Sequence, residues 1–148
     1  MAARSSLALL LLPLACLGAE SCPWLNAATA GGLLGGGAVT TSVTQESTNR
    51  DDAVCVFRAG ASELRLEVMT IDPPRSAFTA HAAECAENQA PLKGIGNEAV
   101  VCGGAGSAQA VARVRNRIFV VRVTTSGDAA ALRENARAAA EHVAGNLF

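Results

Sequence analysis

The clearest strand signature in the chain is ELRLEV, residues 63–68, in which charged and apolar side chains strictly alternate. Successive side chains of a strand point to opposite faces, so this pattern predicts a strand with one face on a core. Asp72-Pro73-Pro74 ends the segment, because proline cannot donate a hydrogen bond to a sheet. Residues 54–58, with the sequence VCVFR, predict a neighbouring strand.

A helix and a hairpin are expected further along the chain. Residues 76–88 predict a helix with an apolar face. A short strand is predicted at residues 98–102. Two more, at residues 110–115 and 118–125, are expected to join at Asn116-Arg117. That turn would place Val114 opposite Phe119 and Arg113 opposite Val120.

Helices are also predicted near both ends of the chain. One covers residues 23–30, and the other runs from Asp128, a good N-cap residue, to about Leu147. Residues 38–44 are rich in β-branched side chains and predict a further strand. The order α-β-β-β-α-β-β-β-α predicts an α+β fold, an antiparallel sheet with helices on one face.

The composition excludes several classes of protein. The chain has 148 residues and a net charge of −1, with 50% hydrophobic and 3% aromatic residues. That length accommodates one ordinary domain, and the apolar content is too high for a disordered chain. The charge lacks the basic excess that drives nucleic-acid binding, so no nucleic-acid partner is expected.

The N-terminal residues predict export. Residues 1–19 combine one arginine, an apolar run at residues 7–17 and small residues before Glu20, which is typical of a signal peptide. Residues 20–148 would then form a single secreted, periplasmic or envelope-attached domain. Leu14-Ala15-Cys16 is similar to a bacterial lipobox, so Cys16 is a candidate for lipidation. A lipid there would be the chain's only link to a membrane.

Four cysteines remain outside the signal segment, and an even number in an exported chain predicts two disulfides. Three connectivities are possible, and we favour Cys22–Cys55 with Cys85–Cys102. The first would tie the N-terminal helix to a strand, and the second would tie the middle helix to the strand after it. The spacing is not that of a zinc site, and four reduced thiols are the alternative.

Few residues suggest catalysis. His81 lies near Glu84 in the predicted middle helix, so a base oriented by a carboxylate is conceivable. His142 suits the end of the last helix. The motif Gly94-x-Gly96-x-x-Ala99 follows a helix and leads into a strand, the reverse of a dinucleotide site, so it predicts a tight turn. No catalytic residue, metal or cofactor is predicted.

The outer sheet face suggests binding. The expected parity places five arginines there among apolar residues, and it also places Val101 outside and Cys102 on the helix side. Guanidinium groups suit carboxylate and phosphate recognition, so these residues are candidate ligands for a small anion or an acidic protein. The alternative is an ordinary solvated face. The five arginines are Arg58, Arg65, Arg113, Arg115 and Arg122.

The chain resembles small bacterial envelope lipoproteins of unknown function. Cys22-Pro23-Trp24-Leu25, Cys55-Val56-Phe57 and Gly94-Ile95-Gly96-Asn97 carry the resemblance, with a strand hairpin and a C-terminal helix. Those lipoproteins are similar to the extracellular sensor domain of mycobacterial receptor Ser/Thr kinases. In that domain a tryptophan stands where Phe57 lies and an aspartate where Asn97 lies. The resemblance implies an envelope-located binding or sensing domain.

Three functions follow as hypotheses. The first is an exported, non-enzymatic binding or sensing domain of the bacterial cell envelope. The second is a small hydrolase with a site around His81. The third is a structural homodimer that buries its open sheet face against a second copy.

Overall fold

The computed structural model describes residues 20–45, 49, 51–85 and 87–148. The predicted signal peptide and Cys16 lie outside these residues. The predicted order of helices and strands is confirmed, with one added two-residue strand, β4. The elements are α1 (Ala27–Leu33), β1 (Thr40–Gln45), β2 (Ala53–Ala59), β3 (Ser62–Thr70), α2 (Pro74–Glu84), β4 (Ala90–Pro91), β5 (Glu98–Gly104), β6 (Ser107–Val114), β7 (Arg117–Thr124) and α3 (Ala129–Leu147).

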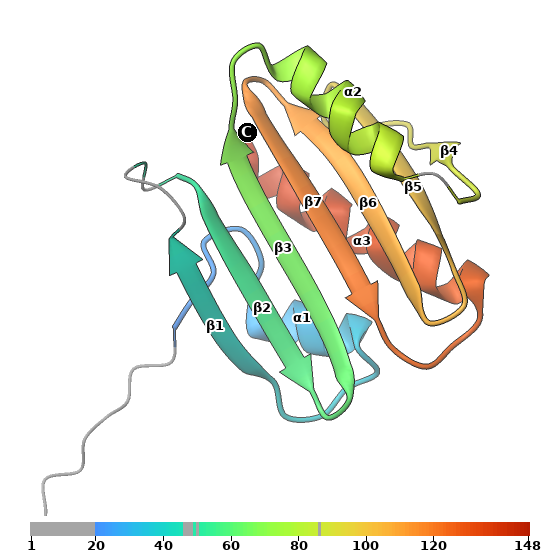
Figure 1. Cartoon of the computed structure of the whole chain (residues 1–148). Coiled ribbons are helices and arrows are strands. Elements are labelled where there is room, and N and C mark those ends of the chain that lie inside the picture. Colours follow the sequence, from blue (N-terminus) through green and yellow to red (C-terminus); the bar gives the residue numbers. More distant parts are fainter. Residues whose placement is uncertain (1–19, 46–48, 50, 86) are drawn as a thin grey trace, which may run out of the picture.

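One antiparallel sheet holds all these strands, in the order β1-β2-β3-β7-β6-β5-β4. Helices cover both of its faces (Figure 1): α1 and α3 lie behind the sheet, and α2 lies in front. The prediction that every helix packs on one face is therefore wrong for α2. Strands β6 and β7 are apolar on both faces at the end where α2 lies, and Val111 and Ile118 are fully buried beneath it.

The larger core lies between the sheet and α3. Side chains from the middle of the sheet, including Leu66 and Phe119, are fully buried there. The apolar stripe of α3 faces them, and Asp128 accepts a hydrogen bond from the Ala131 amide at its N-terminus. None of the helices in the described residues is long and apolar enough to cross a membrane. The stripe consists of Leu132, Ala136, Ala139, Val143 and Leu147.

The smaller core lies under α2 and contains the disulfide Cys85–Cys102. Cys102 therefore faces α2, and Val101 beside it packs in the larger core. The expected parity of these two residues was the reverse, because it assumed that all three helices share one face. Pro74 begins α2 two residues earlier than expected, since proline is favoured in the first turn of a helix.

The disulfide Cys22–Cys55 joins the segment before α1 to the centre of β2. Trp24 and Leu25, which follow the first cysteine, are buried in the larger core. Both predicted disulfides are thus confirmed. Disulfides persist in oxidising compartments, so the pair is consistent with an extracellular or periplasmic protein.

The β6–β7 hairpin turns one residue earlier than predicted. Its two turn residues are Arg115 and Asn116, so Arg113 pairs with Ile118 instead of Val120. Arg115 adopts a positive φ of 57°. This conformation is uncommon for residues other than glycine, so the amino-acid sequence did not indicate a turn at Arg115. The register moves by two residues, an even number, so the predicted faces of the strands are preserved.

The glycines before β5 form the predicted tight turn. Gly94 and Gly96 have φ values of 78° and 59°, and the Asn97 amide donates to the Arg113 carbonyl oxygen at 2.7 Å. The Asn97 side chain accepts from the Arg115 amide, also at 2.7 Å. The turn is therefore fastened to the β6–β7 hairpin, and its backbone amide at Asn97 is already occupied.

Replacing Gly96 with Ala is expected to destabilise the fold through both backbone strain and overlap. A left-handed φ at a residue other than glycine costs about 1–3 kcal/mol. A Cβ at Gly96 would also overlap the Arg113 carbonyl oxygen. Gly106→Ala is the matched control, because Gly106 has a φ of +86° and open space around it. Chemical denaturation should show a larger loss in the free energy of unfolding for Gly96→Ala than for Gly106→Ala. Equal losses would contradict the predicted overlap with the Arg113 carbonyl oxygen.

Candidate functional site

The outer face of the sheet is only partly covered. Helix α2 crosses β7 and β6 and ends at Glu84, just before Cys85, which lies beside β5 (Figure 1). Among the described residues, no helix lies over the outer face of β1, β2 and β3, or over the halves of β6 and β7 nearest the β5–β6 hairpin. We call this uncovered region the open half of the outer face. Its side chains include those of Arg58, Arg65 and Arg122.

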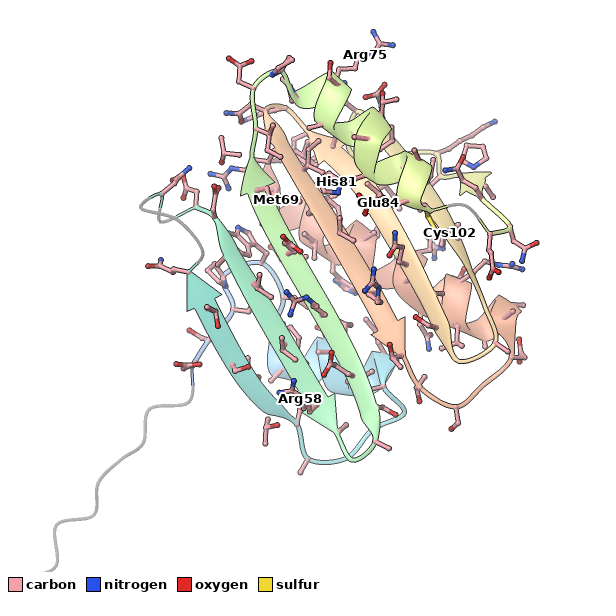
Figure 2. All side chains as sticks on the ribbon, in the orientation of Figure 1. Arg58, Met69, Arg75, His81, Glu84 and Cys102 are labelled. Carbon is pink, nitrogen blue, oxygen red and sulfur yellow. A yellow bond between two sulfur atoms is a disulfide. The ribbon has the colours of Figure 1, made fainter. Side chains whose placement is uncertain are left out.

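Arg58 already has a carboxylate partner. It stands opposite Glu63 across the β2–β3 pair, and its Nε donates to Glu63 Oε2 at 2.9 Å. Both side chains are well exposed, so this ion pair adds little to stability. It does neutralise the guanidinium locally. Figure 2 shows Arg58 at the end of the sheet farthest from Arg75, which lies in the first turn of α2.

Arg113 and Arg115 lie away from the open half. Arg113 Nε donates to Glu98 Oε2 at 2.8 Å, and Arg75 stands 3.5 Å from the other oxygen of that carboxylate. Arg115 is a turn residue, and its guanidinium lies 5.8 Å from the ring centroid of Phe148. The structure thus separates these two arginines from those of the open half.

Arg65 and Arg122 are brought together at the centre of the sheet. They are directly opposite each other in the β3–β7 pair. No ion pair involves either guanidinium within the described residues. Gln109, the next residue across on β6, accepts from Arg122 through Oε1, at 3.3 Å from Nε and 2.9 Å from Nη2. A neutral amide thus orients Arg122, whose hydrogen-bond acceptor among the described residues is not a carboxylate.

A small hollow of about 40 Å³ lies at this pair, and Glu67 and Val120 complete its wall. Two guanidiniums and one carboxylate give the wall a net charge of +1. Like charges directly opposite each other across two strands are destabilising. Two adjacent guanidiniums can donate several charge-assisted hydrogen bonds to one carboxylate or phosphate. An anion bound here would relieve the repulsion between Arg65 and Arg122.

The residues suggested for hydrolysis lie close together on α2 but are not hydrogen-bonded to each other. His81 Nδ1 lies 4.0 Å from Glu84 Oε2, beyond hydrogen-bond length, and 72% of the Glu84 side chain is exposed. Figure 2 shows both residues on α2, beside the open half. Each of Cys22, Cys55, Cys85 and Cys102 is in a disulfide, so none of them provides a thiolate.

Metal binding has no support within the described part of the chain, where no group of three or more His, Cys, Asp or Glu side chains could hold an ion. Asp51, one of two adjacent aspartates, pairs with Arg117 at 2.9 Å. Asp52 accepts a hydrogen bond from the Thr70 amide. These contacts fasten the loop before β2 to the end of the sheet.

The remaining charge cluster belongs to the opposite layer. On α3, Arg137 bridges Glu134 and Glu141 at 2.7 and 2.9 Å. Hydrogen bonding to Arg137 lowers the pKa of the Glu134 carboxyl, with desolvation acting in the opposite direction. The side chains are exposed, so the network is a solvated helix surface that stabilises the fold only slightly.

Sequence reasoning placed Arg65 and Arg122 on one face but did not pair them. Their placement opposite each other depends on the β3–β7 pairing, which joins segments more than 50 residues apart along the chain. The role of Gln109 was missed because it needs the β6–β7 register. The alternation in residues 63–68 was the only sequence signal that could have singled out Arg65.

The chain matches no protein-family model, no curated protein and no solved structure. The open half is a surface with two adjacent guanidiniums, an amide that accepts from Arg122, and no helix of the described residues above them.

Proposed function

We propose that this chain is an exported, non-enzymatic binding or sensing domain of the bacterial cell envelope. Its ligand is a small molecule with a carboxylate or phosphate group, held on the open half by Arg65 and Arg122. The N-terminal signal pattern and the two disulfides support export. The cleaved signal peptide and a lipid on Cys16 are part of the same proposal.

The like-charge pair is the observation that carries this proposal. A carboxylate opposite Arg65 would make the sheet more stable than an arginine there, and Glu63 stands opposite Arg58 in this way. Placing two arginines there lowers stability slightly, and such local costs are typical of functional sites. The size of the hollow, about 40 Å³, suits a single anionic group better than an extended acidic chain.

The proposal is tested by the affinity of the folded domain for inorganic phosphate. A charge-assisted hydrogen bond contributes about 1.5–3 kcal/mol, so Arg122→Gln and Arg65→Gln should each weaken binding by about 10–100-fold. Because Arg65→Gln also removes like-charge repulsion, the free energy of unfolding of that variant should stay equal or rise. Isothermal titration calorimetry and urea denaturation measure the two effects.

Arg58→Gln is the matched control, since it removes one positive charge from the same face at a site already paired with Glu63. Its phosphate affinity should change less than threefold. Equal losses for all three variants would show that only the overall charge of the face matters. Unchanged affinity in Arg65→Gln and Arg122→Gln would overturn the proposal.

The homodimer hypothesis makes a different prediction for the same surface. If the open half were a subunit interface, the protein would have twice its monomer mass in light scattering. The binding proposal predicts that the protein is a monomer under the conditions of the binding assay, because Arg65 and Arg122 must then be accessible to the ligand. A stable dimer that Arg122→Glu dissociates would assign this face to self-association.

A further inference from the structure

A second cavity, of about 370 Å³, opens on the same face beside the arginine pair. It lies between the end of α2 and the β5–β6 hairpin, and Glu84 and Cys102 mark its position in Figure 2. Ligand pockets in proteins commonly have volumes of about 300–1,000 Å³. This cavity therefore has room for part of a small organic molecule.

The walls of the cavity differ in chemistry. Glu84 and Glu87 provide carboxylates from the α2 side, and Ser107 and Gln109 provide hydrogen-bonding groups from β6. Gly104 lines the floor of the cavity and has no side chain to fill it. A Cβ at this position would lie 3.7 Å from the Glu87 carboxylate, its nearest neighbour. The α2 side thus favours a cation, and glycine keeps the space in front of it open.

Gln109 links the cavity to the arginine pair. It lines the cavity, and its side-chain oxygen accepts from Arg122. Its amide NH₂ group has no acceptor among the described residues and is available to a ligand. Neighbouring strands lie about 4.8 Å apart, so the distance across the sheet from β7 to β5 is about 10 Å. Going across the sheet in this direction, the arginine pair comes first, then the Gln109 amide, and then the carboxylates of Glu84 and Glu87.

We propose that the ligand is a zwitterion whose anionic group binds Arg65 and Arg122 and whose ammonium group enters the cavity beside Glu84 and Glu87. This inference rests on the proposed function and specifies the class of ligand. An ammonium ion donates up to three hydrogen bonds, which suits two carboxylates and a serine hydroxyl such as Ser107. A monoanion would use only the arginine end of the site.

The test compares 6-aminohexanoate with hexanoate, which differ only in the ammonium group. The wild-type domain should bind 6-aminohexanoate at least tenfold more tightly than hexanoate in an NMR titration. Glu87→Gln should remove most of this preference and leave hexanoate affinity unchanged. Glu141→Gln, which makes the same change in charge on α3, should keep the preference.

Gly104→Val provides an uncharged test of the cavity. The φ of Gly104 lies outside the left-handed region, and a Cβ there makes only ordinary contacts, so the variant should fold. Its side chain would fill space that the ammonium group needs, and the preference for 6-aminohexanoate should fall at least fivefold.

The outcomes separate the two proposals. Equal affinity of wild type for both probes, or a preference that survives Glu87→Gln and Gly104→Val, would overturn the zwitterion inference. The anion site would then stand if Arg122→Gln still weakens hexanoate binding. Loss of that Arg122 effect would instead overturn the proposed function itself.

Discussion

Removing the Cys22–Cys55 disulfide is expected to lower the free energy of unfolding by about 3–4 kcal/mol, from the chain-entropy cost of a loop of this length. The bond closes a separation of 33 residues and fastens the segment containing Trp24 and Leu25 to β2. Both cysteines are buried, so Cys22→Ala/Cys55→Ala also removes a packed contact. Urea denaturation of the double variant against wild type measures the loss.

Cys85→Ala/Cys102→Ala is the comparison for this experiment. Its bond closes a shorter separation, 17 residues, and the same relation gives about 3 kcal/mol. The first double variant should therefore be at least as destabilised as the second. A loss below about 1 kcal/mol for Cys22→Ala/Cys55→Ala would mean that the N-terminal segment is held without its disulfide.

Replacing Ile118 with Ala is expected to cost about 2–5 kcal/mol, the range for truncating a buried isoleucine. Ile118 points to the outer face, yet it is fully buried because α2 packs over it. On a sheet with all its helices on the other face, the same change would be a surface substitution of about 0.5 kcal/mol. The variant therefore tests the position of α2.

Ile118→Val is the graded control, with an expected loss of about 0.5–1.5 kcal/mol because it removes a single methyl group. The ratio between the two losses should follow the number of carbon atoms removed, three in Ile118→Ala and one in Ile118→Val. A loss near zero for Ile118→Ala, measured by urea denaturation, would show that α2 does not cover this part of the sheet.

Local chemistry accounts for most of the fold that could be predicted. The alternation in residues 63–68 predicted β3, and the apolar stripe that includes Leu132 and Val143 predicted the buried face of α3. Asp128 predicted the start of α3, since its side chain accepts from the Ala131 amide. These features depend on neighbours within a few residues, which the sequence contains directly.

Long-range placement could not be predicted in the same way. Helix α2 lies on the side of the sheet that Cys102 faces. The neighbouring Val101 faces the larger core on the other side. The apolar outer side chains of Val111 and Ile118 carried this information, but strands favour such residues even on exposed faces. The β6–β7 turn was misplaced because Arg115 adopts a positive φ.

The candidate site was predicted only as a set of arginines on one face. Sequence parity could not show that Arg58 and Arg113 have carboxylate partners, or that Arg65 and Arg122 have none among the described residues. Both facts depend on which strands pair, and a pairing of β3 with β7 is not encoded by spacing. The strand pairing therefore identifies Arg65 and Arg122, among the arginines of the outer face, as the candidate site.

The most direct test of the anion site is an NMR titration of the isotope-labelled domain with inorganic phosphate, followed residue by residue. The account predicts saturable shifts at the amides of Arg65 and Arg122 and at Gln109 beside them, and predicts their loss in Arg122→Gln. Saturable shifts confined to another surface, such as α3, would contradict it, as would the absence of any saturable shift.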